Sequence, residues 1–219
     1  MLMKDFITKE FPVLKKSDTV EYALSVMDEL KVRHLPVVAD EIYQCLLSEK
    51  DLLAMPDPAA PVNDPVLFAP SISHSGHLHE IMARMVRYHL TVLPVVSPGG
   101  RYKGVITRDR ILEVLSDLCN AEAAGSVVVV GLTPRDYVLS DIARIIEANN
   151  AHVLNLLSNT DSDTGRLIIT IKIDLEDATP IIRSFERFNY TVLYHFMKRG
   201  MVDDVLQRRM DELLFYMNM

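Results

Sequence analysis

The first half of the chain alternates between a helical and a strand-like hydrophobic pattern. From residue 20 onward, apolar side chains recur three or four positions apart, as on one face of a helix; they are Val20, Ala23, Leu24, Met27 and Leu30. Asp18 and Glu21 precede this stripe at the spacing of a capping box. Apolar, strand-like runs follow at 35–38 and 42–47, and a short helix is expected after 48–51. With an extended segment in front, the pattern predicts strand, helix, strand, strand, short helix.

The same arrangement returns 58 positions later. The string Leu35-Pro36-Val37-Val38 reappears as Leu93-Pro94-Val95-Val96, preceded by His34 in the first copy and by Val92 in the second. The apolar helical positions of the first copy also fall on apolar residues of the second, namely Leu78, Ile81, Met82, Met85 and Tyr88. A fixed interval of this kind indicates a duplicated unit. The proline-rich stretch 56–65 between the copies cannot continue a helix or a central strand, so it is predicted to be a connector.

The pattern changes after the low-complexity joint 121–125. A continuous apolar run at 127–130 is followed by a helical stripe between 139 and 146. The remaining elements are predicted as strands at 153–157 and 167–173, a helix at 181–188 and a strand at 191–196. This order is βαββαβ, the split-βαβ plan of ferredoxin-like domains.

Beyond Gly200 the chain has the pattern of an amphipathic terminal helix over 201–219. Its apolar positions are Val202, Val205, Leu206, Met210, Leu213, Leu214 and Met217. Such a helix must cover an apolar surface, and two interpretations are open: it packs on the small sheet of its own chain, or it packs on a second subunit.

Composition narrows the class of protein. The chain has 219 residues, of which 49% are hydrophobic, and a net charge of −7. This predicts a soluble globular protein without a general attraction for nucleic acid. No apolar segment reaches membrane-spanning length and no secretion signal precedes the first repeat, so neither a membrane partner nor export is expected. Cys45 and Cys119 lack metal-site spacing and suit a reducing compartment, the cytoplasm.

The sequence contains only incomplete matches to motifs for catalysis and metal binding. Gly99 and Gly104 have the interval of a phosphate-binding loop, but Val105-Ile106 stands where lysine and serine or threonine are required. No dinucleotide-binding or hydrolase signature occurs, which predicts a protein that is not an enzyme. His74, His77 and His79 align with the start of a helix, where His77 and His79 are expected to point to different sides, so no metal site is predicted.

The duplicated unit resembles the cystathionine-β-synthase (CBS) motif. The resemblance rests on the amphipathic helix, the Leu-Pro-Val-Val strand and a strand ending in Gly-x-x-Thr-x-x-Asp before a short helix. Two such motifs, about 5–55 and 66–119, resemble a Bateman module spanning 1–120. The region 126–197 resembles an ACT domain. Together they resemble acetoin-utilisation-type regulatory proteins, which implies an α+β fold of tandem CBS motifs, a ferredoxin-like domain and the terminal helix.

The resemblance implies a ligand class. CBS proteins bind AMP, ADP, ATP or S-adenosylmethionine in clefts between their two motifs, and no catalytic cofactor is expected. A carboxylate at the start of the short helix can accept hydrogen bonds from both ribose hydroxyls, while a preceding serine or threonine can donate to a phosphate near the helix N-terminus. The strand around the proline would supply backbone groups and a flat surface for adenine; its residues here are Leu35, Pro36, Val92 and Pro94.

The two motifs match the family pattern unequally. In the first, Ser48 and Asp51 stand at the matching positions, although Cys45 replaces the glycine. In the second, Gly104 and Thr107 match, but Arg110 stands where the aspartate is expected and Asp109 lies one residue early. One residue turns a helical side chain by about 100°. The first cleft is therefore the better candidate, with Arg110 available to a phosphate or to an acidic neighbour.

Several candidate residues have structural explanations beside the functional one. Arg33 and His34 are phosphate partners on the functional interpretation; otherwise Arg33 is a solvated surface charge and His34 an exposed residue at a helix end. Ser48 and Asp51 could serve only to cap their helix. In the ACT-like region the loop 131–136 lacks the expected glycine, so Thr133 and Asp136 are interpreted as turn and cap residues and amino-acid binding is not expected.

The sequence thus supports a non-enzymatic, homodimeric regulator that senses an adenosine-containing ligand. The alternative is a structural or partner-binding dimer whose nucleotide sites have degenerated, as Cys45 and Arg110 suggest.

Overall fold

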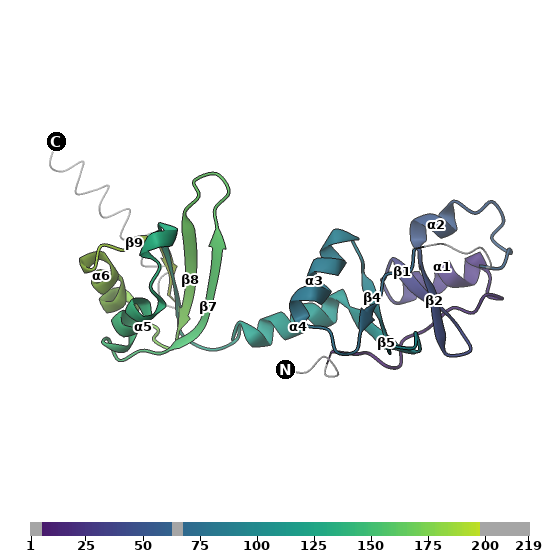
Figure 1. The fold of residues 1–219 in the computed structure, drawn as a ribbon, viewed down its shortest axis with the longest axis horizontal. Helices are drawn as coiled ribbons and strands as arrows, with labels where there is room; N and C mark the ends of the chain where they lie inside the picture. The colour runs from purple at the N-terminus through teal and green to yellow at the C-terminus, as the bar shows by residue number, and fades with distance from the viewer. Residues whose placement is uncertain (1–5, 63–67, 198–219) are drawn as a thin grey trace. The chain divides into compact units, whose positions relative to one another are not determined.

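A computed structural model describes residues 6–62 and 68–197, which form two compact units, Met1–Leu115 and Ser116–Met219 (Figure 1). The helix predicted over 201–219 lies outside the described residues. Within the first unit the two sequence repeats fold alike. The helices and strands of the first repeat are α1 (Val20–Glu29), β1 (His34–Ala39), β2 (Ile42–Ser48) and α2 (Glu49–Leu53). Those of the second are β3 (Ile72–Ser73), α3 (Leu78–Arg87), β4 (Val92–Val96), β5 (Tyr102–Thr107) and α4 (Arg108–Leu118).

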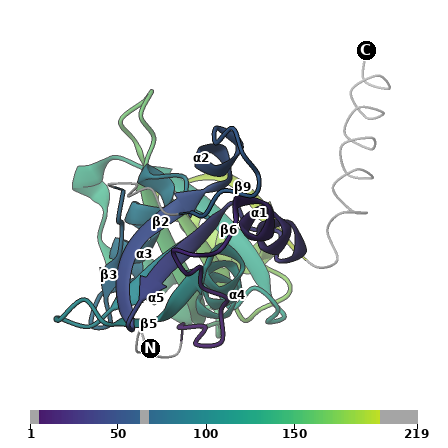
Figure 2. The ribbon, with the colours of Figure 1, turned by 90° about the vertical axis from the view of Figure 1, so that its right-hand side faces the viewer.

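Each repeat is built on an antiparallel hairpin that buries the Leu-Pro-Val-Val strand. β1 pairs with β2, and β4 pairs with β5, each with one bulge near the turn. The leading strand is short in the second repeat, where β3 runs parallel to β4. In the first repeat it is reduced to a single parallel bridge between Leu14 and Val37. α1 packs beside the β1–β2 hairpin, with α2 at its end (Figure 2).

The two repeats exchange their leading segments. Thr8 from the N-terminal segment pairs with Val105 of β5 through two backbone hydrogen bonds of 2.8 and 3.1 Å. Reciprocally, the amide of Leu46 in β2 donates to the carbonyl of Phe68, which leads into the second repeat, at 3.1 Å. The sheet of each repeat is thus extended by the segment that leads into the other repeat. Phe6 and Leu46 accordingly belong to the core that is otherwise formed by the second repeat.

This exchange explains the glycine of the second motif. Gly104 has φ +130°, and a Cβ there would lie 2.6 Å from the carbonyl oxygen of Thr8. A residue with a side chain would therefore be strained and would push the exchanged segment away.

One predicted helix cap is wrong. α1 is capped by Thr19, whose Oγ1 accepts a hydrogen bond from the amide of Tyr22 at 3.2 Å. Asp18 turns back and accepts from the amide of Lys15 at 2.8 Å, closing the preceding turn. The Asp18–Glu21 capping box is therefore not formed, because the helix begins one residue later than its spacing requires.

The second unit has the predicted βαββαβ order. Its elements are β6 (Ser126–Leu132), the 3₁₀ turn η2 (Pro134–Asp136), α5 (Leu139–Glu147), β7 (Val153–Thr160), β8 (Leu167–Ile173), α6 (Thr179–Arg187) and β9 (Thr191–Phe196). The sheet order is β7-β8-β6-β9, and all neighbours are antiparallel. α5 and α6 cover one face of this sheet, where Val128, Val130, Ile169 and Phe185 are among the core residues (Figure 1).

Candidate functional site

The two repeats meet where their central hairpins run into the following helices. His34 pairs with Ser48 at the end of the β1–β2 hairpin, and Val92 pairs with Thr107 at the equivalent end of β4–β5. α2 begins directly after Ser48 and α4 directly after Thr107. The N-termini of these two helices, and the residues around them, form what we call the junction.

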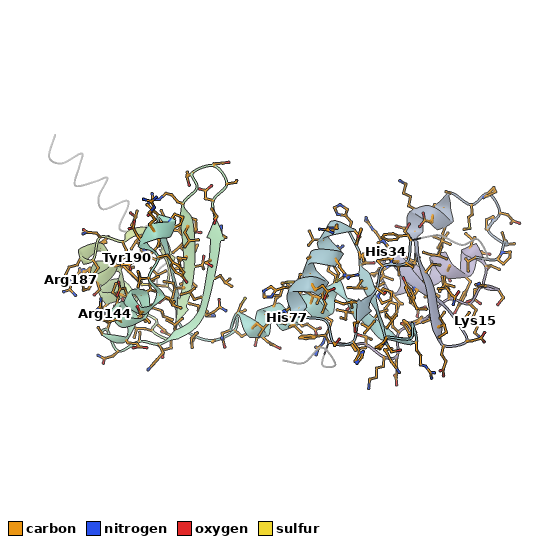
Figure 3. The ribbon with its side chains drawn as sticks, viewed as in Figure 1. Lys15, His34, His77, Arg144, Arg187 and Tyr190 are labelled. Atoms are coloured by element: carbon orange, nitrogen blue, oxygen red, sulfur yellow. The ribbon has the colours of Figure 1, made fainter. Side chains whose placement is uncertain are left out.

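Hydrogen bonds across the junction hold the repeats together. The amide of Arg33 donates to Thr91 Oγ1 at 3.0 Å. The amide of Thr91 donates to His34 Nδ1 at 3.3 Å, and Thr91 Oγ1 lies 3.0 Å from the same nitrogen. His34 is labelled among the side chains of the first repeat in Figure 3. The backbone carbonyls of Arg33 and Thr91 in turn accept from the first amides of α2 and α4, those of Glu49 and Arg108, at 2.9 and 3.0 Å. His34 is thus a bonded residue of the interface between the repeats.

Three charged residues of the junction, Asp51, Arg108 and Arg33, act electrostatically on His34. Burial lowers the pKa of His34 below its ordinary value. The Arg108 and Arg33 charges act in the same direction, and the Asp51 carboxylate opposes them. Because Nδ1 accepts from the Thr91 amide, the neutral ring carries its proton on Nε2. At neutral pH His34 is therefore a neutral donor rather than a cation.

Ser48 and Asp51 form a complete capping box at the start of α2. Ser48 Oγ accepts from the Asp51 amide at 3.2 Å, and Asp51 Oδ2 accepts from the Ser48 amide at 3.0 Å and from Ser48 Oγ at 2.6 Å. Asp51 is half-buried. Within the described part of the chain its second oxygen, Oδ1, makes no hydrogen bond. One carboxylate oxygen thus serves the helix and the other remains an available acceptor.

The second repeat has a basic residue where the first has its acid. Thr107 Oγ1 accepts from the Arg110 amide at 3.1 Å and so caps α4. Arg110 Nη1 forms an ion pair with Glu113 Oε2 at 2.6 Å. Asp109 is exposed in the first turn of α4. Arg108 Nη2 donates to the Leu90 carbonyl at 3.1 Å. This end of the junction offers cations and helix amides, without an acid in the place of Asp51.

The sequence comparisons decide the family. Residues 3–56 and 62–117 each match the family model of the CBS domain, together just over half of the chain. The chain belongs to the CBS domain family.

Solved structures resemble about half of the chain. A CBS domain pair/ACT domain protein from Thermotoga maritima is 22% identical over 53% of this chain and 98% of its own, with a TM-score of 0.46. CBSX2 in complex with AMP is 25% identical over 53% of this chain and 97% of its own, with a TM-score of 0.47. A putative acetoin utilization protein from Vibrio cholerae is 22% identical over 56% of this chain and 95% of its own, with a TM-score of 0.48.

The strand residues predicted to contact adenine lie in the cores of the CBS pair. Leu35 and Val92 are 0% exposed, and Pro36 and Pro94 are also buried. Their side chains fill the interior of the motifs, so in this conformation only their backbone can contact a ligand.

Cys45, at the position of the family glycine, is a buried free thiol. Burial raises its pKa above the ordinary value; nearby Lys16 opposes this effect and Asp51 adds to it. Cys45 is therefore a neutral packing residue beside the junction.

Sequence reasoning missed two residues of the junction, Thr91 and Arg108. The signal was present in the repeat, since Thr91 stands 58 positions after Arg33. Because Thr91 aligns with a charged residue, the repeat did not indicate a shared role for this position. Arg108 was not predicted, because the family pattern directed attention to positions 109 and 110.

The histidines of the CBS pair are arranged differently from the prediction. His77 caps α3, and its ring stacks on that of His79, with a centroid separation of 4.9 Å. Their Nδ1 atoms lie 3.2 Å apart, so the expectation that they point to different sides is wrong. The Nδ1 atom of His77 turns back to accept from the His79 amide, which brings the rings together. No group of three or more His, Cys, Asp or Glu suited to a metal occurs among the described residues.

In the second unit the loop after β6 is the 3₁₀ turn η2, in which the Asp136 amide donates to the Thr133 carbonyl at 3.0 Å. Thr133 Oγ1 donates to Asp136 Oδ2 at 2.7 Å. Both residues therefore belong to the turn, as predicted, but neither side chain caps η2. Open hollows of about 550 and 490 Å³ lie beside α6 and on the sheet of this unit. In the described part of the chain, no helix is long and apolar enough to cross a membrane.

Proposed function

We propose that the CBS pair binds an adenosine-containing ligand, AMP, ADP, ATP or S-adenosylmethionine, at the junction, and that the protein is a non-enzymatic regulator. The observation that carries this proposal is the position of Asp51. It stands at the N-terminus of α2, and its charge acts on His34, which is hydrogen-bonded to Thr91 of the other motif. An acid that could hold a ribose therefore lies at the boundary between the motifs.

The free oxygen of Asp51 supports ribose binding. Oδ1 can accept a hydrogen bond from one ribose hydroxyl, and Oδ2 can accept from the second when Ser48 Oγ turns away. A serine hydroxyl has a single proton, so Ser48 cannot donate to Asp51 and to a phosphate at once. Ligand binding would thus exchange the 2.6 Å Ser48–Asp51 hydrogen bond for two ligand contacts.

The phosphate would lie in positive surroundings. The N-termini of α2 and α4 carry partial positive charge, which favours an anion. Arg33 and Arg108 both act electrostatically on His34, so each lies close enough to contribute. Arg33 is largely exposed and its Nε is 3.9 Å from Glu49 Oε2, a separation that leaves it able to turn towards a phosphate.

We infer one site in each chain. At the equivalent position of the second motif, Arg110 replaces the acid and is paired with Glu113, while the carboxylate of Asp109 lies one residue away and is exposed. A ribose there would lack the acceptor that Asp51 provides.

A thermal-shift screen with AMP, ADP, ATP and S-adenosylmethionine tests the proposal. AMP is the first probe. Ligand at 100 times its dissociation constant is expected to stabilise the protein by about 2.7 kcal/mol. Unchanged melting curves with all four compounds would contradict nucleotide sensing.

One observation favours the alternative, a structural or partner-binding dimer with degenerate sites. The capping box already satisfies one oxygen of Asp51 without any ligand. Under this alternative, Asp51→Ala would destabilise the protein through the lost cap alone and would leave its response to nucleotides unchanged. Under the sensing proposal the same substitution removes most of the response.

We further propose that the second unit is an ACT-type domain and that the protein is a cytoplasmic homodimer without nucleic-acid or membrane partners. The βαββαβ order of the second unit and the order of its strands in the sheet support an ACT-type domain. Exposed apolar side chains on the helices of the CBS pair support dimerisation; they include Leu53, Val86, Tyr88 and Leu112. Sedimentation at the mass of a monomer would contradict the dimer.

A further inference from the structure

The sheet of the second unit has one face covered by α5 and α6 and a second face that no helix of the described residues covers (Figure 1). We call the second face the outer face. Because neighbouring residues of a strand alternate between faces, its side chains point away from Val128 and Val130 of the helix-covered core. The strand register arranges these side chains in three rows: Asn155, Lys172, Val127 and Phe196; Leu157, Thr170, Val129 and Tyr194; and Asn159, Ile168 and Gly131, over which Leu193 lies.

The outer face exposes apolar side chains where a solvated face of an antiparallel sheet is usually polar. Leu157, Leu193, Tyr194 and Phe196 are between 42% and 62% exposed. The rings of Tyr194 and Phe196 pack edge to face, with centroids 5.6 Å apart. Leu193 rests against Gly131, where a Cβ would come within 3.2 Å of the leucine side chain. These exposed side chains are thus already held in place, which lowers the entropy cost of covering them.

The charged side chains at the margins of the outer face are engaged within the chain. Lys172 donates to the carbonyl oxygens of Asn120 and Ala121. Arg166, which precedes β8, donates to the Gly131 carbonyl at 3.1 Å. The three rows contain no acid. The outer face therefore favours a neutral, apolar partner, and a second copy of the same face brings neither an acid nor a free cation to it.

The shape of the outer face suits a copy of itself. Phe196 projects from the first row, with 62% of its surface exposed. Beyond the middle row lies an open hollow of about 490 Å³, bounded by Ile168, Thr170, Leu193 and Tyr194 and by residues 159–162. In a two-fold symmetric contact the same surface serves both partners, so the projection of one copy can enter the hollow of the other. Two copies also share one sheet twist, from which the aligned packing of two sheets arises.

The area of the outer face is close to what a stable dimer needs. The four exposed apolar side chains offer roughly 350–400 Å² in each copy, taking about 150–250 Å² for a whole aromatic side chain and less for leucine. Asn159 and Thr160 are also exposed, and Val127, Ile168 and Thr170 are half-buried. With these residues, two copies would bury about 1,000–1,200 Å² in total, the lower limit for a specific interface.

We propose that two copies of the protein associate through the outer faces of their second units, sheet against sheet, about a two-fold axis through the centre of the middle row. Phe196 of each copy then lies in the hollow of the other. This contact is separate from the exposed helices of the CBS pair and gives the protein a second surface for self-association.

Cross-linking of single cysteines in the full chain tests this proposal. With Cys45→Ala and Cys119→Ser as background, Thr170→Cys places a thiol in the middle row. A two-fold axis through the centre of that row passes within about 5 Å of Thr170, so a bismaleimide that spans about 10 Å, the separation of packed sheets, should link two copies. Glu186→Cys is the matched control, because Glu186 is exposed on α6, on the helix-covered side, and should stay unlinked.

The expected result is a covalent dimer on denaturing gels for Thr170→Cys alone. Equal linking in both variants, or none in either, would overturn the proposal. A thiol at position 170 that stays unlinked and resists maleimide would show that another segment of the chain or another molecule covers the outer face, which also contradicts it. If the unlinked variant still sediments as a dimer, the contact through the CBS pair stands and only the outer-face contact is refuted.

Two exposed phenylalanines provide a second, matched test. Phe196 is 62% exposed on the outer face, and Phe188 is 51% exposed at the end of α6. In the Thr170→Cys chain, Phe196→Asp is expected to lower the cross-linked fraction at least about tenfold, because a carboxylate would be buried without a partner between the sheets. Phe188→Asp should leave that fraction unchanged. Both variants should fold, which melting curves check, and equal cross-linking in the two would rule the contact out.

Discussion

Removing the carboxylate of Asp51 separates its role in the helix cap from its role towards a ligand. Asp51→Ala deletes both hydrogen bonds that Oδ2 accepts from Ser48, so the unliganded protein should lose about 0.5–2 kcal/mol. The effect on ligand binding is separate and larger. Hydrogen bonds from ribose hydroxyls to a charged acceptor contribute about 1.5–3 kcal/mol, which corresponds to roughly a 10- to 150-fold weaker affinity.

The assay compares the ligand-induced shift of each variant with its own unliganded melting curve. At 100 times the wild-type dissociation constant, the wild type gains about 2.7 kcal/mol, whereas a variant with 100-fold weaker binding gains only about 0.4 kcal/mol. Asp109→Ala is the matched control, because this exposed acid occupies the first turn of α4 and should not contact the ligand. A full ligand shift in Asp51→Ala, or an equal loss in both variants, would refute the role assigned to Asp51.

Three further outcomes follow from the first unit. Gly104→Ala should lower the free energy of unfolding by roughly 2–4 kcal/mol in urea titrations, because its Cβ would collide with Thr8; Gly99→Ala, with no atom within 4 Å, should change it by less than about 0.5 kcal/mol. The pKa of His34 is lowered on folding, so the unfolded chain binds more protons in the pH range between that lowered pKa and about 6.5. Stability should therefore fall on acidification through that range, by at most about 1.4 kcal/mol per pH unit for this group, and His34→Gln should reduce the slope; an unchanged slope would contradict the assignment. Ser48→Ala should weaken the binding of AMP more than that of adenosine, measured by calorimetry, and an equal effect on both would place Ser48 away from the phosphate.

The element order of both units could be predicted from the sequence for physical reasons. The apolar stripe of α1 and its copy in α3 have the helical period, and the Leu-Pro-Val-Val strands are too short and too apolar to be anything but buried strands. The repeat interval then fixed the correspondence between the motifs. The pairing of Ser48 with Asp51 could be predicted because the two residues are only three positions apart.

Contacts between distant segments could not be predicted from the sequence. Nothing in the hydrophobic pattern indicates that Thr8 pairs with Val105, or that His34 accepts a hydrogen bond from Thr91, because both depend on how the repeats pack against each other. The stacking of His77 on His79 depends on one side-chain rotation at a helix cap, which periodicity does not encode. The strand around Leu35 and Val92 was predicted to offer a flat surface to adenine, whereas both side chains are buried, which depends on how the motif packs.

Titration calorimetry of the full chain with AMP tests the central claim most directly. The account predicts saturable binding of one nucleotide per chain, with an affinity that is roughly 10- to 150-fold weaker in Asp51→Ala and unchanged in Asp109→Ala. Absence of binding heat with AMP, ADP, ATP and S-adenosylmethionine at millimolar concentration, or an affinity that is unchanged in Asp51→Ala, would contradict it.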